Sequence, residues 1–171
     1  MPTMTETDFN PVARLASLPL EHGTDRGDFA GAFHRIGERL ALSKLGASYL
    51  EVPPGKAACP CHVHHAIDEM FVILAGEGEY RFGDRCHAVA AGDVLGAPLG
   101  QLDYAHKLTN TGTTTLKYLA ISSVSDADIC EYPDSGKFAA GSEIGFHFIG
   151  RAEDTRNYWE GEIQDLPATR K

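Results

Sequence analysis

The 171-residue sequence has few basic residues, few cysteines and no long apolar run. Its 15 lysines and arginines are outnumbered by 24 aspartates and glutamates, which gives a formal net charge of −9. Because phosphate backbones and anionic membranes are bound by clustered Lys and Arg, neither nucleic acid nor a membrane surface is an expected partner. No apolar stretch reaches the roughly 18 residues of a membrane-spanning helix, and the N-terminus shows no basic region followed by an apolar one. A cytoplasmic protein is therefore expected.

The four cysteines form no C-x-x-C pair, so neither a zinc ribbon nor a dithiol redox motif is expected. In a reducing compartment they are expected to be free thiols. Cys59-Pro60-Cys61 offers two thiolates to a metal as the alternative, but no second pair completes a tetrahedral site. The P-loop pattern and the G-x-S-x-G elbow are also absent, which argues against nucleotide binding and serine hydrolysis.

Short apolar stretches separated by turn signals occupy the middle of the chain. Gly83-Asp84 and Gly92-Asp93 divide the segment GEGEYRFGDRCHAVAAGDVLGAPLG into three brief strands. About seven or eight strands with frequent turns predict an antiparallel sandwich or barrel. The earlier segment AGAFHRIGERLALSKLG fits either a helix or a strand. The length suits one domain with a substantial core.

Two histidines and a glutamate form the candidate site. His62 and His64 are two residues apart on an expected strand, so their side chains leave the same face, about 7 Å apart. Glu69 begins the next apolar run and has the same parity as Phe71 and Ile73, so it is expected to point inward. A carboxylate inside a barrel is costly unless it is paired or binds a metal. For any one of these residues alone a solvated surface position is the better interpretation, but a metal ion would remove the cost of burying them all at once.

The spacing of ten residues resembles the two signatures of the cupin superfamily, G-x5-H-x-H-x3/4-E-x6-G and G-x5-P-x-G-x2-H-x3-N. The first is matched by Gly55, His62, His64, Glu69 and Gly76, and the second by Gly92, Pro98, Gly100, His106 and Asn110. One extra residue precedes His62, and five residues rather than two separate Gly100 from His106. The second departure predicts a longer loop or bulge before His106.

The resemblance implies an all-β fold, a double-stranded β-helix or jelly-roll barrel with short N- and C-terminal extensions. It implies a single cupin domain over 1–171, with the barrel core at about 46–123 and extensions at 1–45 and 124–171. It also implies a homodimer, since cupins often pair through edge strands. The chain further resembles compact bacterial cupins that share the segments LKYLAISS and EYPDSGK.

The resemblance also implies one divalent transition metal ion, Fe, Mn, Ni, Co or Zn, on His62, His64, Glu69 and His106. This predicts a metal-dependent enzyme that acts on a small polar metabolite, hydroxy-carbonyl or sugar-like, by isomerase, lyase or oxygenase chemistry. The alternatives are a non-catalytic ligand-binding or sensor protein and a metal that only stabilises the fold.

Two further residues near His106 are candidates for the site. Tyr104 lies two residues before His106 and faces the same cavity if the strand is regular, where it could donate a proton; a core tyrosine is the alternative. Asn110 is expected to support His106.

Overall fold

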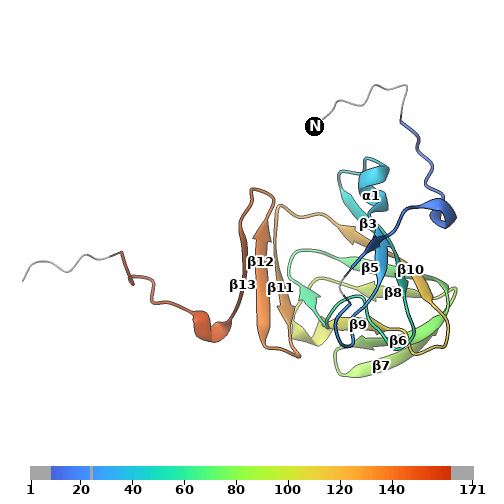
Figure 1. The fold of residues 1–171 in the computed structure, drawn as a ribbon. Helices are drawn as coiled ribbons and strands as arrows, with labels where there is room; N and C mark the ends of the chain where they lie inside the picture. Colours follow the sequence, from blue (N-terminus) through green and yellow to red (C-terminus); the bar gives the residue numbers. More distant parts are fainter. Residues whose placement is uncertain (1–8, 24, 163–171) are drawn as a thin grey trace, which may run out of the picture.

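The computed structural model describes residues 9–23 and 25–162, and most of their regular structure is β-strand (Figure 1). The strands are β1 (Glu21–His22), β2 (Ala32–His34), β3 (Leu45–Val52), β4 (Val63–His64), β5 (Glu69–Ala75), β6 (Glu77–Phe82), β7 (Arg85–Ala90), β8 (Val94–Ala97), β9 (His106–Thr109), β10 (Leu116–Ser123), β11 (Ala127–Tyr132), β12 (Lys137–Ser142) and β13 (His147–Arg151). The helical pieces are η1 (Leu15–Ser17), α1 (Ile36–Arg39), η2 (Leu102–Tyr104) and η3 (Ala152–Asp154).

The first sheet has the order β1-β2-β3-β10-β5-β8, and its strands pair antiparallel. Its centre is β10, which pairs with β3 over its full length and with β5 on its other side. Along β5 the side chains of Phe71 and Ile73 are buried while Met70 and Leu74 are exposed. This alternation follows the period of two of a half-buried strand and turns Glu69 toward the interior.

The second sheet consists of the strand groups β13-β12-β11-β4 and β7-β6-β9. A bridge between His62 and His106 joins the two groups, through N–H···O bonds of 3.1 Å and 2.8 Å in the two directions. The two groups of strands therefore form one continuous sheet. The two sheets enclose the barrel interior, and this arrangement confirms the predicted double-stranded β-helix.

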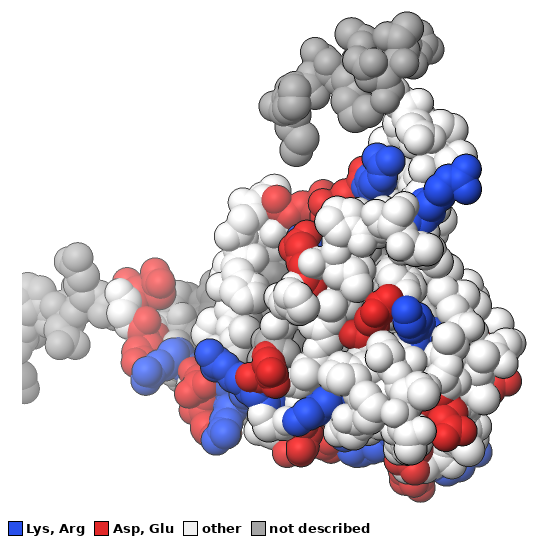
Figure 2. Space-filling model, turned by 45° about the vertical axis from the view of Figure 1, so that its right-hand side comes forward, with Lys and Arg blue, Asp and Glu red and all other residues white. Residues whose placement is uncertain are grey.

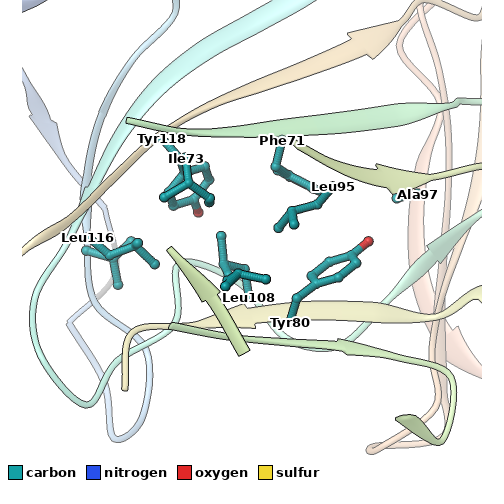
Figure 3. Close-up of a cluster of buried hydrophobic side chains, with 10 residues drawn as sticks. Phe71, Ile73, Tyr80, Leu95, Ala97, Leu108, Leu116 and Tyr118 are labelled. Carbon is teal, nitrogen blue, oxygen red and sulfur yellow. The ribbon is translucent and has the colours of Figure 1, made fainter. Parts of the chain in front are cut away.

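The core lies between the two sheets and consists of aliphatic and aromatic side chains (Figure 3). Ile73 and Leu116 are its most completely buried large side chains. Phe71 also belongs to this core, and its ring centroid lies 5.6 Å from that of His106. The apolar core therefore extends directly to the candidate site.

Two positions in the signatures have clear structural roles. Gly76, between β5 and β6, has φ +83°, and a Cβ there would lie 2.9 Å from the backbone of Leu116, so only glycine fits. Asn110 is fully buried: its Nδ2 donates to Val52 O and Thr114 O, and its Oδ1 accepts from Gly112 N. Asn110 thus fixes the turn after β9, and the expectation that it supports His106 is wrong.

The flanks of the barrel are more regular than the sequence indicated. The undecided segment before β3 contains both a strand, β2, and a single helical turn, α1. Beyond residue 124, where the sequence patterns fade, β11, β12 and β13 add three strands to the second sheet. The outermost residues of both predicted extensions, 1–8 and 163–171, lie outside the described residues.

The surface carries both signs of charge. On the face in Figure 2, basic side chains are interspersed with acidic ones, without a broad basic area. Among the described residues, no helix is long and apolar enough to cross a membrane.

Candidate metal centre

The four predicted ligands come from both sheets and meet between them. His62 and His64 lie at β4, and His106 begins β9, so these three residues belong to the second sheet. Glu69 begins β5 in the first sheet. His62 and His106 are brought side by side by their backbone bridge, with ring centroids 4.6 Å apart.

All three imidazoles direct Nε2 toward one oxygen atom, Glu69 Oε2. The distances are 3.4 Å from His62, 3.6 Å from His64 and 3.1 Å from His106. One ligand atom each from His62, His64 and Glu69 also lie within 4.8 Å of one another, and His106 joins them through its contact with Glu69. The structure therefore brings together all four residues that the sequence singled out.

The opposite nitrogen of each ring, Nδ1, faces an oxygen acceptor. His62 Nδ1 donates to Pro60 O at 2.9 Å, His64 Nδ1 to Asp128 Oδ2 at 2.5 Å and His106 Nδ1 to Tyr104 O at 3.3 Å. A carbonyl oxygen can only accept, so Nδ1 carries the proton. In the neutral ring the Nε2 lone pair is then free and points to the centre of the cluster.

Burial and hydrogen bonding shift the pKa values of His62 and Glu69 in opposite directions. Burial disfavours the charged form of His62, but hydrogen bonds with Cys59 and Glu69 outweigh it and raise its pKa to about 11. Burial also disfavours the Glu69 carboxylate, yet hydrogen bonds from His106 and His62 hold its pKa far below the usual range. The site therefore strongly favours a positive charge beside the Glu69 carboxylate.

The donor set fits a divalent transition metal. Three imidazole nitrogens and one carboxylate oxygen suit Fe, Mn, Ni, Co or Zn. A metal ion requires all three Nε2 atoms to be deprotonated, and three lone pairs directed at a carboxylate are repelled by it unless a cation lies among them. His62 and His106 are 9% and 3% exposed, so water screens this repulsion little.

Metal binding is expected to release protons and to weaken as the pH falls. Because the pKa of His62 is raised, its ring is protonated at neutral pH, and a metal ion must displace that proton. For each proton released, the apparent affinity changes by about tenfold per pH unit. Calorimetric titration with Mn(II) at pH 6, 7 and 8, in buffers of different ionisation enthalpy, measures the number of protons released and the change of the affinity with pH. An affinity that is constant over this range would contradict the expectation.

Asp128 contacts the cluster and was not anticipated from the sequence. It lies on β11, and its side chain is 15% exposed. One carboxylate oxygen accepts from His64 Nδ1, and the other accepts from the backbone N–H of Ala66 at 2.9 Å. Asp128 thus fixes the orientation and tautomer of His64 from outside the signature segments.

The Asp128→Asn variant is expected to bind metal about 10- to 100-fold more weakly, because the His64 ring loses its charged acceptor. Glu131→Gln is a matched control, since Glu131 accepts from His65 Nε2 at 2.6 Å in an exposed pair away from the cluster. Competition with a chelating dye measures both affinities. Equal affinities for the two variants would show that Asp128 has no positioning role.

The structure places Tyr104 outside the regular strands. It belongs to η2 rather than to a strand, so the parity argument that turned it inward does not apply. Its side chain is 43% exposed, and its ring stacks on Phe82 with centroids 5.6 Å apart. The long connection before His106, predicted from the spacing, is the cause. A catalytic role for Tyr104 stays a prediction.

A different tyrosine, Tyr132, lies beside the cluster. Its ring centroid is 6.3 Å from that of His62. Burial, followed by a hydrogen bond with Cys130, raises the pKa of its phenol above the usual range, so the phenol keeps its proton at neutral pH. No local signal marked Tyr132, because its approach depends on the pairing of β11 with β4.

The cysteines are free among the described residues, as predicted. Cys61 is buried and alternates with His62, whereas Cys59 Sγ lies 3.9 Å from His62 Nδ1.

An antiparallel double-stranded β-helix with three histidines and a glutamate gathered between its sheets defines a small jelly-roll barrel with a candidate metal centre. Residues 48–122 match the family described as Cupin domain. These residues, a little under half of the chain, form a cupin domain.

Relatives extend the comparison in sequence and in fold. An oxalate-binding protein of Thermotoga maritima is 33% identical over 72 residues, which are 42% of this chain and 56% of that protein, so the chain spans little more than half of its length. A provisionally named sugar phosphate isomerase of Acidithiobacillus ferrooxidans has a TM-score of 0.76 at 24% identity, over 90% of this chain and 94% of that one. A sugar phosphate isomerase of Silicibacter pomeroyi has a TM-score of 0.75 at 18% identity, over 88% and 98%. At these identities the two structures establish a shared fold.

Proposed function

We propose that this cupin is a metal-dependent enzyme acting on a small polar metabolite with a hydroxy-carbonyl or sugar-like group. The proposed ligands of its single divalent transition metal ion are His62, His64, Glu69 and His106. The observation that carries the proposal is the convergence of three imidazole Nε2 atoms on Glu69 Oε2, at 3.1 to 3.6 Å. Isomerase, lyase and oxygenase chemistry are the reaction classes that such a centre supports.

The proposed centre is accessible from one side. The side chains of His64 and Glu69 are 20% and 16% exposed, while that of His106 is 3% exposed. Four protein ligands leave two positions free on a six-coordinate ion, and open positions distinguish catalytic from structural sites. An ion bound there supplies a Lewis acid for a carbonyl or hydroxyl oxygen of the substrate. The substrate is expected to approach past His64 and Glu69.

The surrounding residues have separate proposed roles. Asp128 holds His64 in place, so that its Nε2 keeps one orientation through the reaction. Tyr132 keeps its proton at neutral pH and is the proposed hydrogen-bond donor to a substrate oxygen. The core side chain Phe71 packs against His106 and excludes water from the buried side of the cluster.

Reconstitution with single metals tests the proposed activity. Chelator-treated protein is loaded with Fe(II), Mn(II), Co(II) or Zn(II) and incubated with a panel of hydroxy-carbonyl compounds, while oxygen uptake and NMR spectra of the products are recorded. Isomerase or lyase activity is expected to proceed without O₂ and with several metals, whereas an oxygenase requires iron and consumes O₂. Absence of turnover with every loaded metal would contradict an enzymatic function.

The relative of Thermotoga maritima supports a second candidate, a non-catalytic binder of small chelating anions. That relative is described as an oxalate-binding protein. A binder of this kind is expected to hold oxalate on the metal-loaded protein without changing it. Saturable oxalate binding by calorimetry, with no product in the NMR spectrum, would favour this candidate over the enzyme.

A further inference from the structure

The face of the second sheet that carries the histidines continues beyond the barrel onto β11 and β12. His62 pairs with His106, and His64 is opposite Cys130. Cys130 is in turn opposite Ala139 on β12. Directly paired residues of antiparallel strands project to the same face, so this face runs without a break from the candidate centre to the outer strands. Figure 1 shows β11, β12 and β13 standing side by side at one edge of the barrel.

Tyr132 and Lys137 are neighbours on this face. They are directly opposite each other on β11 and β12. The Tyr132 ring is 6.3 Å from the His62 ring, and the Lys137 ammonium is 5.8 Å from the centre of the Tyr132 ring. The lysine side chain therefore bends back over the tyrosine, toward the centre rather than away from it.

Two polar contacts hold this part of the sheet against the barrel. At one end, Asp128 binds His64 and the backbone of Ala66. At the other, the turn between β11 and β12 is fixed by Arg81 on β6, whose guanidinium donates to both carboxylate oxygens of Asp134 at 2.8 Å and 2.9 Å. Tyr132 and Lys137 lie between these two attachments, so their position beside the centre is well defined.

The same face is hollowed next to Asp128. A depression of about 360 Å³ lies at the end of β11 and β12 opposite to the Tyr132–Lys137 pair, and the carboxylates of Asp126, Asp128 and Glu143 line it together with Cys130, Ala139, Gly141 and His147. Ala139 and Gly141 are small, so little side-chain volume covers the strands at this point. The hollow adjoins Asp128, but neither Tyr132 nor Lys137 lines it.

The charge of Lys137 is available to a ligand. Within residues 9–23 and 25–162, its ammonium forms no ion pair, whereas Lys117 is paired with Glu51 at 3.0 Å. Adjacent strands are about 4.8 Å apart, and β12 lies two strands from His62. A molecule that reaches from the centre to Lys137 therefore spans about 10 Å or somewhat less, the length of a five- or six-carbon chain with a terminal group.

We propose that this face, defined by Asp128, Tyr132, Lys137 and Ala139, is the substrate-binding wall of the site. Lys137 binds an anionic terminal group, carboxylate or phosphate, of a sugar-sized metabolite whose hydroxy-carbonyl end reaches His64 and Glu69. This inference rests on the proposed function and adds the charge and length of the substrate to it. It makes Lys137 a specificity-determining residue outside the segment that matches the cupin domain.

The test compares three six-carbon probes that differ only in the terminal group: glucose, glucuronate and glucose 6-phosphate. Their binding to protein loaded with Mn(II), with the metal content measured first, is followed by calorimetry. The Lys137→Gln variant is compared with Lys44→Gln, which removes the same charge at an exposed position between α1 and β3. Mn(II) binding and melting temperature are recorded for both variants.

At least one anionic probe is expected to bind more tightly than glucose, and Lys137→Gln is expected to weaken it about tenfold, with glucose and Mn(II) binding unchanged. The response of glucuronate or of glucose 6-phosphate distinguishes carboxylate from phosphate as the recognised group. Equal effects of Lys137→Gln and Lys44→Gln, or no probe binding to metal-loaded protein, would overturn this inference and leave the proposed metal centre standing. Failure to bind Mn(II) at all would contradict the proposed function, and this inference with it.

Discussion

Glu69→Ala and His106→Ala are each expected to lower the metal content of the purified protein to less than about a tenth of that of the unchanged chain. Glu69 Oε2 is the atom on which all three imidazoles converge, and His106 is the closest of them at 3.1 Å. Removing a ligand costs more affinity than removing its supporting group, for which about 10- to 100-fold is typical. Elemental analysis of each variant, purified without chelators, measures the loss.

Glu38→Ala is the control for the loss of a carboxylate, because Glu38 is 76% exposed on α1. It is expected to keep full metal content. The circular dichroism spectra of both site variants are expected to retain the β-sheet signal, since neither side chain belongs to the cluster of buried apolar residues between the sheets. Full metal content in a folded Glu69→Ala or His106→Ala variant would refute the ligand assignment.

Asn110→Ala is expected to lower the free energy of unfolding by about 3 kcal/mol or more, although Asn110 touches none of the proposed ligands. The substitution removes three buried hydrogen bonds and leaves Val52 O, Thr114 O and Gly112 N without their partner. A buried polar group that loses its partner costs about 1–3 kcal/mol. Urea denaturation of the two proteins under the same conditions measures the difference.

Asn157→Ala is the matched control for that measurement. Asn157 is exposed, and its Oδ1 accepts one local hydrogen bond from Trp159 N at 2.9 Å. Its removal is expected to change stability by less than about 1 kcal/mol, because water replaces the lost partner. If Asn110→Ala cost no more than Asn157→Ala, the structural role assigned to Asn110 would be wrong.

The inward position of Glu69 could be predicted because it depends on local periodicity. Phe71 and Ile73 follow it on β5 with the same parity, and a strand puts residues of equal parity on one face. The three brief strands between Gly76 and Gly100 were likewise marked by glycine–aspartate turns. Features that a single strand or turn determines are therefore accessible from the sequence.

The interpretation of Tyr104 did not agree with the structure because it extended strand parity through an irregular segment. The residues before His106 form a loop with the single helical turn η2, and Gly100 packs under the Tyr104 ring, where a Cβ would lie 2.4 Å from the ring. Residues two apart no longer point to the same face once the backbone leaves the strand conformation. The extra residues between Gly100 and His106 signalled the irregularity but not the direction of the side chain.

Asp128, Tyr132 and Lys137 were missed for a different reason. Asp128 and Tyr132 lie next to the centre, and Lys137 lies beside Tyr132, only because β11 pairs with β4, two segments more than 60 residues apart in the chain. No spacing within either segment indicates that pairing, because it depends on the closure of the whole second sheet. The strands beyond residue 124 therefore look like an extension in sequence and form part of the site in space.

The most direct test of the metal centre is the number of metal atoms per chain in untagged protein purified without chelators. We expect close to one atom of Fe, Mn, Ni, Co or Zn per chain, and its loss in Glu69→Ala. Iron would direct the search toward reactions with O₂, and the other metals toward isomerase or lyase chemistry. Metal well below one per chain, not restored when Fe(II), Mn(II), Ni(II), Co(II) or Zn(II) is added back, would show that these four side chains do not bind a metal ion.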